Sequence, residues 1–203
     1  MLELTDERIV PEKMKLTNGL LLEHLARYHF TIPFLHGRVL DFACGSGYGT
    51  HIMAKIAKKK VTEVVGIDIS EETIMYAKKT YYHPKSTFIV GDVADPKLPS
   101  SLGNFDCIVS FETIEHVQQE EQFLLNIYDM LKPGGTLILS TPFGQGRGYP
   151  TNEPYHVHQL SREEFFNLFP TYDEVSFFYQ KGVLVVPKNE STFYPIGIVV
   201  CKK

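Results

Sequence analysis

VLDFACGSGYGT, residues 39–50, carries the strongest structural signal in this chain of 203 residues. Its apolar start ends at Asp41, and apolar residues return at helical spacing between positions 52 and 56. Between them lies a loop that has glycine at alternate positions, namely Gly45, Gly47 and Gly49. Glycine tolerates positive φ angles and, having no Cβ, lets a ligand approach the backbone. The pattern predicts a strand, a glycine loop and a helix, as in the first turn of a nucleotide-binding α/β unit.

The spacing of the glycines narrows the choice of ligand. A dinucleotide fingerprint reads G-x-G-x-x-G, whereas this loop reads G-x-G-x-G and has Thr50 where the fingerprint has Gly or Ala. Either pattern alone would also fit a loop that merely connects two elements. Asp68, however, ends the next apolar run, where an acid can accept hydrogen bonds from two ribose hydroxyls. Together the two features predict a ligand that contains adenosine.

Five motifs occur in order along the chain and resemble those of the class I S-adenosylmethionine-dependent methyltransferases, in their small-molecule branch. They are VLDFACGSGYGT, GIDIS (66–70), GDV (91–93), FDCIVSFETIEHV (105–117) and LKPGGTLILSTP (131–142). The resemblance covers about residues 35 to 180 and implies S-adenosyl-L-methionine as the cofactor. Ala43 departs from the pattern, since many members of the family have glycine at this position.

Near-continuous apolar strands alternate with helices, which predicts a parallel sheet covered on both faces. With the resemblance, the expected fold class is α/β, a Rossmann-like doubly wound sheet of seven strands that is mainly parallel with an antiparallel C-terminal strand. Two strands with no helix between them, at 172–180 and 193–201, are expected to form a hairpin at the sheet edge. The other strands are expected at 38–44, 62–69, 86–91, 105–111 and 136–140.

The chain is expected to form a single methyltransferase domain over residues 1–203. An N-terminal arm and helix occupy 1–34, the cofactor-binding core 35–142, and the substrate loop, a helix and the terminal hairpin 143–203. The arm itself, residues 1–16, is polar and is expected to be loosely ordered.

Composition is that of an ordinary globular protein, with 43% hydrophobic and 22% charged residues. A net charge of −4 gives no basic surface for nucleic acid or a membrane, so neither is expected as a partner. The odd number of cysteines and the absence of an apolar signal segment predict reduced thiols in a cytoplasmic protein. The three cysteines are Cys44, Cys107 and Cys201.

The resemblance also assigns roles in cofactor binding. Asp41 is expected near the ammonium group of the methionine portion, and Asp92 is expected to accept a hydrogen bond from the adenine amine. Two alternatives come from the residues themselves: Asp41 could cap backbone N–H groups of the loop, and Asp92 could cap the short helical turn that follows. The remaining expected contacts, made largely by backbone or apolar groups, are Phe42, Ala43, Gly45, Gly47, Ile69, Val93, Phe111 and Glu112.

The loop after the fifth strand contains the candidates for a general base. His156 and His158 alternate with Tyr155 and Val157, so an extended chain would place both histidines on one side. Histidine is the natural base near neutral pH, and His116 is a third candidate, although it could instead brace a helix. The His-x-His pattern also permits a metal reading, but no third ligand stands at a recognisable spacing, so no metal is predicted.

These observations predict methyl transfer from S-adenosyl-L-methionine to a small-molecule acceptor, through an oxygen nucleophile. The loop with His156 and His158, together with ERIVP (7–11) and Ala26-Arg27-Tyr28, resembles a branch of the family associated with glycan and lipid precursors, which the resemblance therefore implies as acceptors. Three other readings remain. A nucleic-acid methyltransferase is disfavoured by the acidic pI of about 6.1, and a nicotinamide dehydrogenase by the glycine spacing. A cofactor-binding module without catalysis is disfavoured by the histidine-rich loop. The sequence predicts no oligomeric state.

Overall fold

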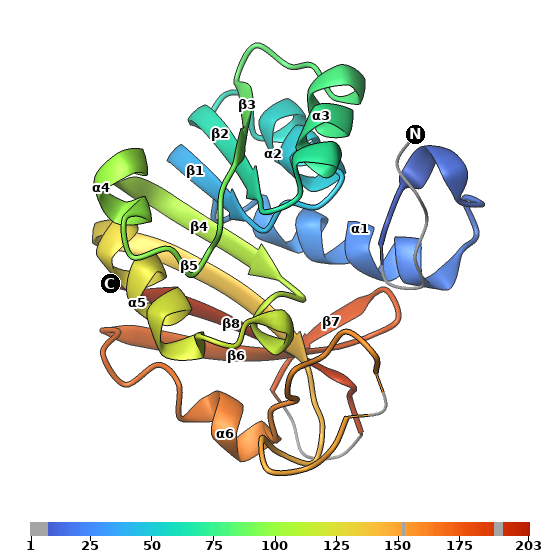
Figure 1. Ribbon diagram of the computed structural model, residues 1–203, viewed down its shortest axis with the longest axis vertical. Helices are drawn as coiled ribbons and strands as arrows, with labels where there is room; N and C mark the ends of the chain where they lie inside the picture. Colours follow the sequence, from blue (N-terminus) through green and yellow to red (C-terminus); the bar gives the residue numbers. More distant parts are fainter. Residues whose placement is uncertain (1–7, 152, 189–192) are drawn as a thin grey trace.

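The computed structural model describes residues 8–151, 153–188 and 193–203, within which eight strands form one sheet (Figure 1). The strands lie in the order β3-β2-β1-β4-β5-β8-β6-β7. The first five in this order are parallel, and each of the last three is antiparallel to the strand before it. Their bounds are β1 Gly37–Phe42, β2 Val61–Asp68, β3 Ser86–Val90, β4 Phe105–Phe111, β5 Leu131–Pro142, β6 Glu174–Lys181, β7 Leu184–Pro187 and β8 Ile196–Lys202.

The fold class expected from the sequence is confirmed, with one strand more than expected. β6 and β8 are antiparallel neighbours at the edge, as predicted, but the chain between them contains β7. β7 forms because Gly182, at φ +57°, reverses the chain directly after β6, so that Leu184 pairs with Lys181. A four-residue strand ending in proline gives too short an alternation to be recognised in the sequence.

Helices cover both faces of the sheet, α1 to α3 on one and α4 to α6 on the other (Figure 1). Side chains cap α3 and α6: the Ser70 hydroxyl accepts a hydrogen bond from the backbone of Thr73, and Ser161 and Glu164 form a capping box. The helices are α1 Gly19–Thr31, α2 Tyr48–Ile56, α3 Glu71–Thr80, α4 Leu98–Leu102, α5 Glu120–Met130 and α6 Arg162–Phe166, with the short 3-10 helices η1 Pro11–Lys13 and η2 Ile114–His116.

Alternation along β1 decides where its side chains go. Val39 packs under α1 to α3, whereas Leu40 and Phe42 belong to the core on the opposite face. The Phe42 ring stacks on Phe123 of α5, with ring centroids 5.4 Å apart. Because successive side chains in a strand point to opposite faces, Asp41 is directed toward α1 and α2, as Val39 is.

The first seven residues of the expected N-terminal arm lie outside the described residues, and the part that follows packs on the core. Ile9 and Val10 are buried, and the Ser46 hydroxyl of the glycine loop donates to the carbonyl of Ile9 at 2.7 Å. The expectation of a loosely ordered arm is therefore wrong for these residues, because two adjacent apolar side chains are drawn into the core.

All three cysteines are buried and unpaired, as their number suggested; the cytoplasmic location stays a prediction. Among the helices that the structure describes, none combines the length and the apolar character needed to cross a bilayer.

Gly49 in α2 is where the α1–α2 packing leaves no room for a side chain. A Cβ built there would overlap the ring of Tyr28 in α1. In an open helix Gly→Ala stabilises by up to about 1 kcal/mol; here we expect Gly49→Ala to destabilise by about 1–3 kcal/mol through overpacking. Denaturant unfolding measures the change. Gly19→Ala in α1 is the matched control, since no atom lies within 4 Å of its built Cβ. Equal midpoints for the two variants would contradict the packing argument.

Candidate active site

A cavity of about 880 Å³ opens at the carboxyl ends of the parallel strands. Its wall includes the loop after β1, the ends of β2, β3 and β4, and part of the segment 153–159. β1 and β4 are neighbours in the sheet, although β2 and β3 lie between them in the chain. The direction in which successive strands are added to the sheet therefore reverses between β1 and β4. Open α/β sheets bind ligands at this point, and the volume lies in the range of small-molecule pockets.

The loop after β1 has left-handed backbone at alternate positions. Ala43 has φ +70°, Gly45 has φ +54° and Gly47, the N-cap of α2, has φ +89°. Ala43 is the position where the sequence departs from the family pattern, and its positive φ explains why glycine is favoured there. Ala43 and Gly45 line the cavity; Gly47 lies behind it, close to Ala77 and Phe88.

Asp68 is held in one orientation at the end of β2. One carboxylate oxygen accepts the backbone N–H of Gly45 at 3.0 Å, and the other accepts that of Ser70 at 2.9 Å. Each oxygen can accept a further hydrogen bond, and the half-buried side chain lines the cavity. A preoriented carboxylate of this kind fits a pair of ribose hydroxyls.

The neighbouring contacts predicted for adenine also lie on the cavity wall. Asp92 is exposed and accepts the backbone N–H of Ala94 at 2.9 Å, which stabilises the turn at 93–94 and leaves its second oxygen for a ligand. It does not cap the helix that follows, because the N-cap of α4 is Lys97. Val93 lies beside it. Ile69 is 70% exposed and lines the same wall, so it does not belong to the hydrophobic core.

Asp41 lies behind the cavity wall rather than on it. It is buried and accepts hydrogen bonds from the hydroxyls of Tyr28 at 3.2 Å and Thr50 at 2.6 Å. Burial, with a smaller contribution from the charge of Asp68, raises the pKa of Asp41 to about 7. Tyr28, unlike Asp41, lines the cavity, so Asp41 would act on a ligand through Tyr28.

The end of β4 carries a strained acid. Glu112 has φ +49°, lines the cavity and accepts the Ser140 hydroxyl at 2.8 Å. Its second oxygen is 3.9 Å from Nη2 of Arg27, which is fully buried and donates from Nη1 to Gln180 of β6 at 2.8 Å. Phe111 lies beside Glu112 on the wall, edge to face with Tyr28 at 5.1 Å between ring centroids. Left-handed backbone at a non-glycine residue is typical of functional sites.

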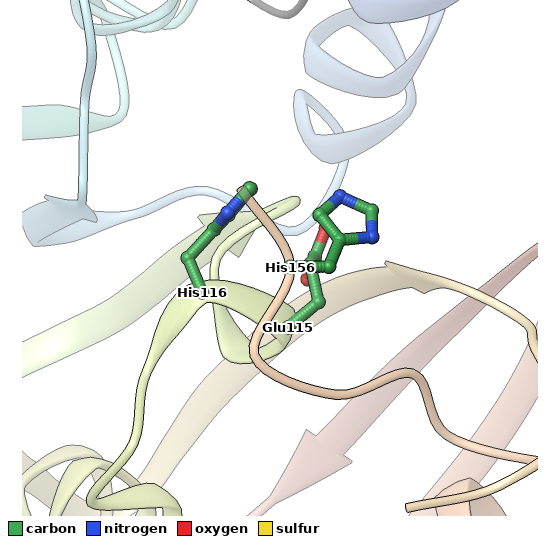
Figure 2. Close-up of side chains that lie close together, drawn as sticks. All are labelled: Glu115, His116 and His156. Carbon is green, nitrogen blue, oxygen red and sulfur yellow. The ribbon is translucent and has the colours of Figure 1, made fainter. Parts of the chain in front are cut away.

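Beyond Glu112, three side chains from two segments lie close together: Glu115 and His116 of η2, and His156 of the loop after β5 (Figure 2). All three line the cavity. The two imidazole rings are edge to face, with centroids 4.8 Å apart. Glu115 is buried, and burial together with the neighbouring carboxylate of Glu112 raises its pKa. The structure thus brings together two of the three predicted histidines.

His158 is not part of this group. The chain turns at residues 154–155 and bends at 157, and the backbone N–H groups of Val157 and His158 both point to the carbonyl of Glu115, at 2.9 and 3.4 Å. The expectation that His156 and His158 share one side is therefore wrong, because the segment is not extended. His158 instead places Nε2 3.2 Å from a carboxylate oxygen of Glu120, and burial lowers its pKa.

Several residues that line the cavity were not predicted from the sequence. Tyr28 and Tyr48 line the cavity, and the Tyr48 hydroxyl is 3.0 Å from Nδ1 of His24 in α1. Both tyrosines also belong to the hydrophobic core on the α1 to α3 face of the sheet. Gln159 was missed as well; its amide lies 3.1 Å from Nδ1 of His156. Its position depends on the turn at 154–155, which carried no recognisable signal.

The known proteins to which this chain is similar are methyltransferases. Residues 40–139 match the family model described as a methyltransferase domain. A probable S-adenosylmethionine-dependent methyltransferase of Mycolicibacterium smegmatis is 33% identical over 175 residues, which is 84% of this chain and 64% of the relative. The mitochondrial ubiquinone biosynthesis O-methyltransferase of Schizosaccharomyces pombe is 32% identical over 109 residues, 51% of this chain and 37% of the relative.

Among solved structures, the small RNA methyltransferase HEN1 has a TM-score of 0.74 at 19% identity, over 96% of this chain and 27% of that one; at this identity the likeness concerns the fold alone. The chain spans about three fifths of the length of the Mycolicibacterium smegmatis relative and of a probable S-adenosylmethionine-dependent methyltransferase of Mycobacterium tuberculosis. It belongs to the class I S-adenosylmethionine-dependent methyltransferases, a family of enzymes whose cofactor is S-adenosyl-L-methionine. The preoriented Asp68 and the open backbone at Ala43 and Gly45 fit that cofactor.

The raised pKa of Asp41 predicts a pH-dependent stability. An aspartate in the unfolded chain ionises near pH 4, whereas folded Asp41 keeps its proton up to about pH 7. Between these values the unfolded state binds fewer protons, so the free energy of unfolding falls as pH rises, by up to about 1.4 kcal/mol per pH unit. Asp41→Asn should remove this contribution. Denaturant titrations of parent and variant from pH 4 to 7 measure the difference, and parallel curves would contradict it.

For Asp68 we expect a loss of cofactor affinity. Asp68→Ala removes a charged hydrogen-bond acceptor and should weaken binding of S-adenosylhomocysteine by about 1.5–3 kcal/mol in calorimetry. Asp95→Ala is the matched control, because Asp95 also accepts a backbone N–H, from Lys97 at 2.9 Å, but does not line the cavity. If Asp68→Ala lowers the melting temperature while the folded protein binds as before, Asp68 is structural.

Proposed function

We propose that the protein transfers the methyl group of S-adenosyl-L-methionine to an oxygen atom of a small-molecule acceptor that occupies the outer part of the cavity. One observation supports this most directly: a single cavity is lined both by Asp68, suited to ribose, and by the imidazoles of His116 and His156. A cofactor site and a site for a proton-bearing acceptor are therefore continuous.

In this proposal the cofactor lies along the ends of β1 to β4. Asp68 binds the ribose, Asp92 and the backbone of Val93 bind adenine, and Ile69 packs on its face. Phe111 and Glu112 lie near the methionine portion, where the carboxylate of Glu112 stabilises positive charge. The cofactor supplies a methyl group on a sulfonium, which is already a good leaving group.

The residues around the acceptor have two tasks. They must align the nucleophile with the methyl group, and alignment of this kind can contribute about 7–11 kcal/mol to lowering the barrier. They must also help the acceptor hydroxyl to lose its proton, since a neutral alcohol is a poor nucleophile. His116 and His156 line the cavity and are the groups that we assign to this task.

Oxygen as the attacked atom is supported by the yeast relative, which is named as an O-methyltransferase. The family resemblance favours glycan and lipid precursors, so an acceptor screen should begin with them. A nucleic-acid acceptor is disfavoured by the net charge of −4, and an RNA oligonucleotide in the same screen tests that alternative directly.

The experiment measures cofactor binding and turnover separately. Calorimetry with S-adenosylhomocysteine should give a dissociation constant in the micromolar range, about −8 kcal/mol. The protein is then incubated with S-adenosyl-L-methionine and each acceptor, and the S-adenosylhomocysteine formed is quantified. Binding without turnover on any acceptor would indicate a cofactor-binding module, and binding of NAD in place of S-adenosylhomocysteine would overturn the cofactor.

The two histidines of the loop provide a matched pair of variants. His156 lines the cavity, whereas His158 lies against Glu120. We expect His156→Ala to lower turnover by about 10²–10⁴-fold, the range found when proton transfer loses its catalyst, with little change in S-adenosylhomocysteine affinity. His158→Ala should stay within a few-fold of the parent. Equal rates for the two variants would show that the loop is only a brace.

A further inference from the structure

We propose that Glu115, His116 and His156 form a binding site for one divalent transition-metal ion on the wall of the cavity. Each side chain offers a ligand atom, and the three atoms lie within 4.8 Å of one another. Two segments distant in sequence supply them, and all three residues line the cavity. The proposal deepens the function proposed above, and rests on it for the role of the ion in catalysis but not for its binding.

Glu115 has a carboxylate oxygen without a hydrogen-bond partner in the part of the chain that the structure describes. Glu115 is only 1% exposed, and its Oε2 accepts the Thr141 hydroxyl at 3.0 Å. Its Oε1 is buried and has no hydrogen-bond partner among the described residues. A buried acceptor without a partner is costly, by about 1–3 kcal/mol and more when charged, unless a ligand satisfies it. Figure 2 shows the carboxylate beside His156.

The orientation of the His116 imidazole also suits a metal ligand. Nδ1 of His116 is 2.9 Å from the carbonyl oxygen of Tyr155 and therefore carries the proton that it donates there. This fixes the tautomer whose Nε2 is a lone-pair donor. Metal-binding histidines ordinarily donate their other N–H to a carbonyl or carboxylate in this way.

Nδ1 of His156 is 3.1 Å from the amide nitrogen of Gln159, an arrangement in which Nδ1 accepts and Nε2 carries the proton. Metal binding through Nε2 therefore requires the Gln159 amide to turn over, so that its oxygen accepts Nδ1–H and Nε2 becomes a lone-pair donor. In that orientation Gln159 accepts the Nδ1–H of His156, as the Tyr155 carbonyl accepts the Nδ1–H of His116.

The surrounding backbone holds the three ligands in register. The carbonyl of Glu115 accepts the N–H of Val157 at 2.9 Å, which ties η2 to the loop that carries His156. The carboxylate of Glu112 adds a second acidic group next to Glu115. Nη2 of Arg27 is 3.9 Å from a carboxylate oxygen of Glu112. A divalent ion would supply the further positive charge that two neighbouring carboxylates require.

Two imidazoles and one carboxylate favour a first-row transition ion over magnesium or calcium, which prefer oxygen ligands. Three protein ligands leave coordination positions open, as in catalytic metal sites. From the sequence no metal is predicted, because no third ligand stands at a recognisable spacing from His156 and His158. The structure replaces His158 by Glu115 and His116.

The ion would lower the pKa of an acceptor hydroxyl that binds it. The hydroxyl proton passes to solvent water, and the oxygen attacks the methyl carbon. The O–C bond forms as the C–S bond breaks. The electron pair of the C–S bond remains on sulfur, which becomes the neutral thioether of S-adenosylhomocysteine. His116 and His156 then act as ligands rather than as bases.

Binding is tested with the metal alone. The full chain, treated with EDTA and dialysed, is titrated with Co²⁺ and with Mn²⁺ in a calorimeter, and Co²⁺ coordination is followed by its visible absorption. We expect one equivalent to bind, and Glu115→Gln and His156→Ala to weaken binding by at least about 100-fold, since even outer-shell changes cost 10–100-fold. His158→Ala should bind as the parent does. Retained S-adenosylhomocysteine binding shows that each variant is folded.

His51 and His83, with ring centroids 6.2 Å apart, form a separate histidine pair on the molecule, so His83→Ala is measured as well. Loss of binding only in His83→Ala, or no binding by the parent, would overturn the site. EDTA-treated protein should lose turnover at least about 100-fold and regain it with Mn²⁺ or Co²⁺. Turnover unaffected by EDTA would refute the catalytic role while leaving the proposed methyl transfer standing. Metal binding without turnover on any acceptor would refute the proposed function and leave the site intact.

Discussion

The left-handed backbone that follows β1 is the constraint on which the cavity depends. Because Ala43, Gly45 and Gly47 all have positive φ, the chain leaves the strand without placing a large side chain over the sheet edge. The loop is held from three directions. Asp68 accepts the N–H of Gly45, the Cys44 N–H donates to the carbonyl of Ile67, and Ser46 donates to the carbonyl of Ile9. The candidate ribose acceptor thus also supports the loop that makes room for the ribose.

A second constraint is the satisfaction of polar groups buried beside the cavity. Asp41, Arg27 and Glu115 are each at most 1% exposed. Asp41 is satisfied by two hydroxyls from α1 and α2, and Arg27 partly by Gln180 of β6. These bonds connect the first helix to the centre and the far edge of the sheet, so the wall of the cavity is tied to elements distant in sequence. Within the described residues, Oε1 of Glu115 and both Nε and Nη2 of Arg27 are buried without a hydrogen-bond partner.

The sequence predicts those parts of the fold and of the site that depend on interactions between residues close together in the chain. Local signals suffice for the strand–loop–helix at Val39, for the cap at Ser70 and for Asp68, since each follows from neighbouring residues and from the fixed geometry of a parallel sheet. His156 and His158 are different, because their sides are decided by hydrogen bonds to the Glu115 carbonyl about 40 residues away. Period-two alternation applies only to an extended segment. Tyr28 and Gln159 were missed for the same reason: their partners, Asp41 and His156, are identified only once the chain has folded.

The charge of the cavity wall connects the cofactor with the two proposals. Within the described residues that line it, five are acidic and Arg8 is the one cation besides histidine; the acids are Asp68, Asp92, Glu112, Glu115 and Glu153. A low-dielectric cleft lined by one sign of charge favours ligands of the opposite sign. S-adenosyl-L-methionine has a positive sulfonium, and methyl transfer converts it to a neutral thioether, so the attraction weakens as the reaction proceeds. The same acidic wall would attract a divalent ion, and Glu115, the most buried of the five, is the acid that gains most from one. An acidic wall would therefore favour the charged cofactor over its product and, in the proposed metal site, a cation beside the acceptor.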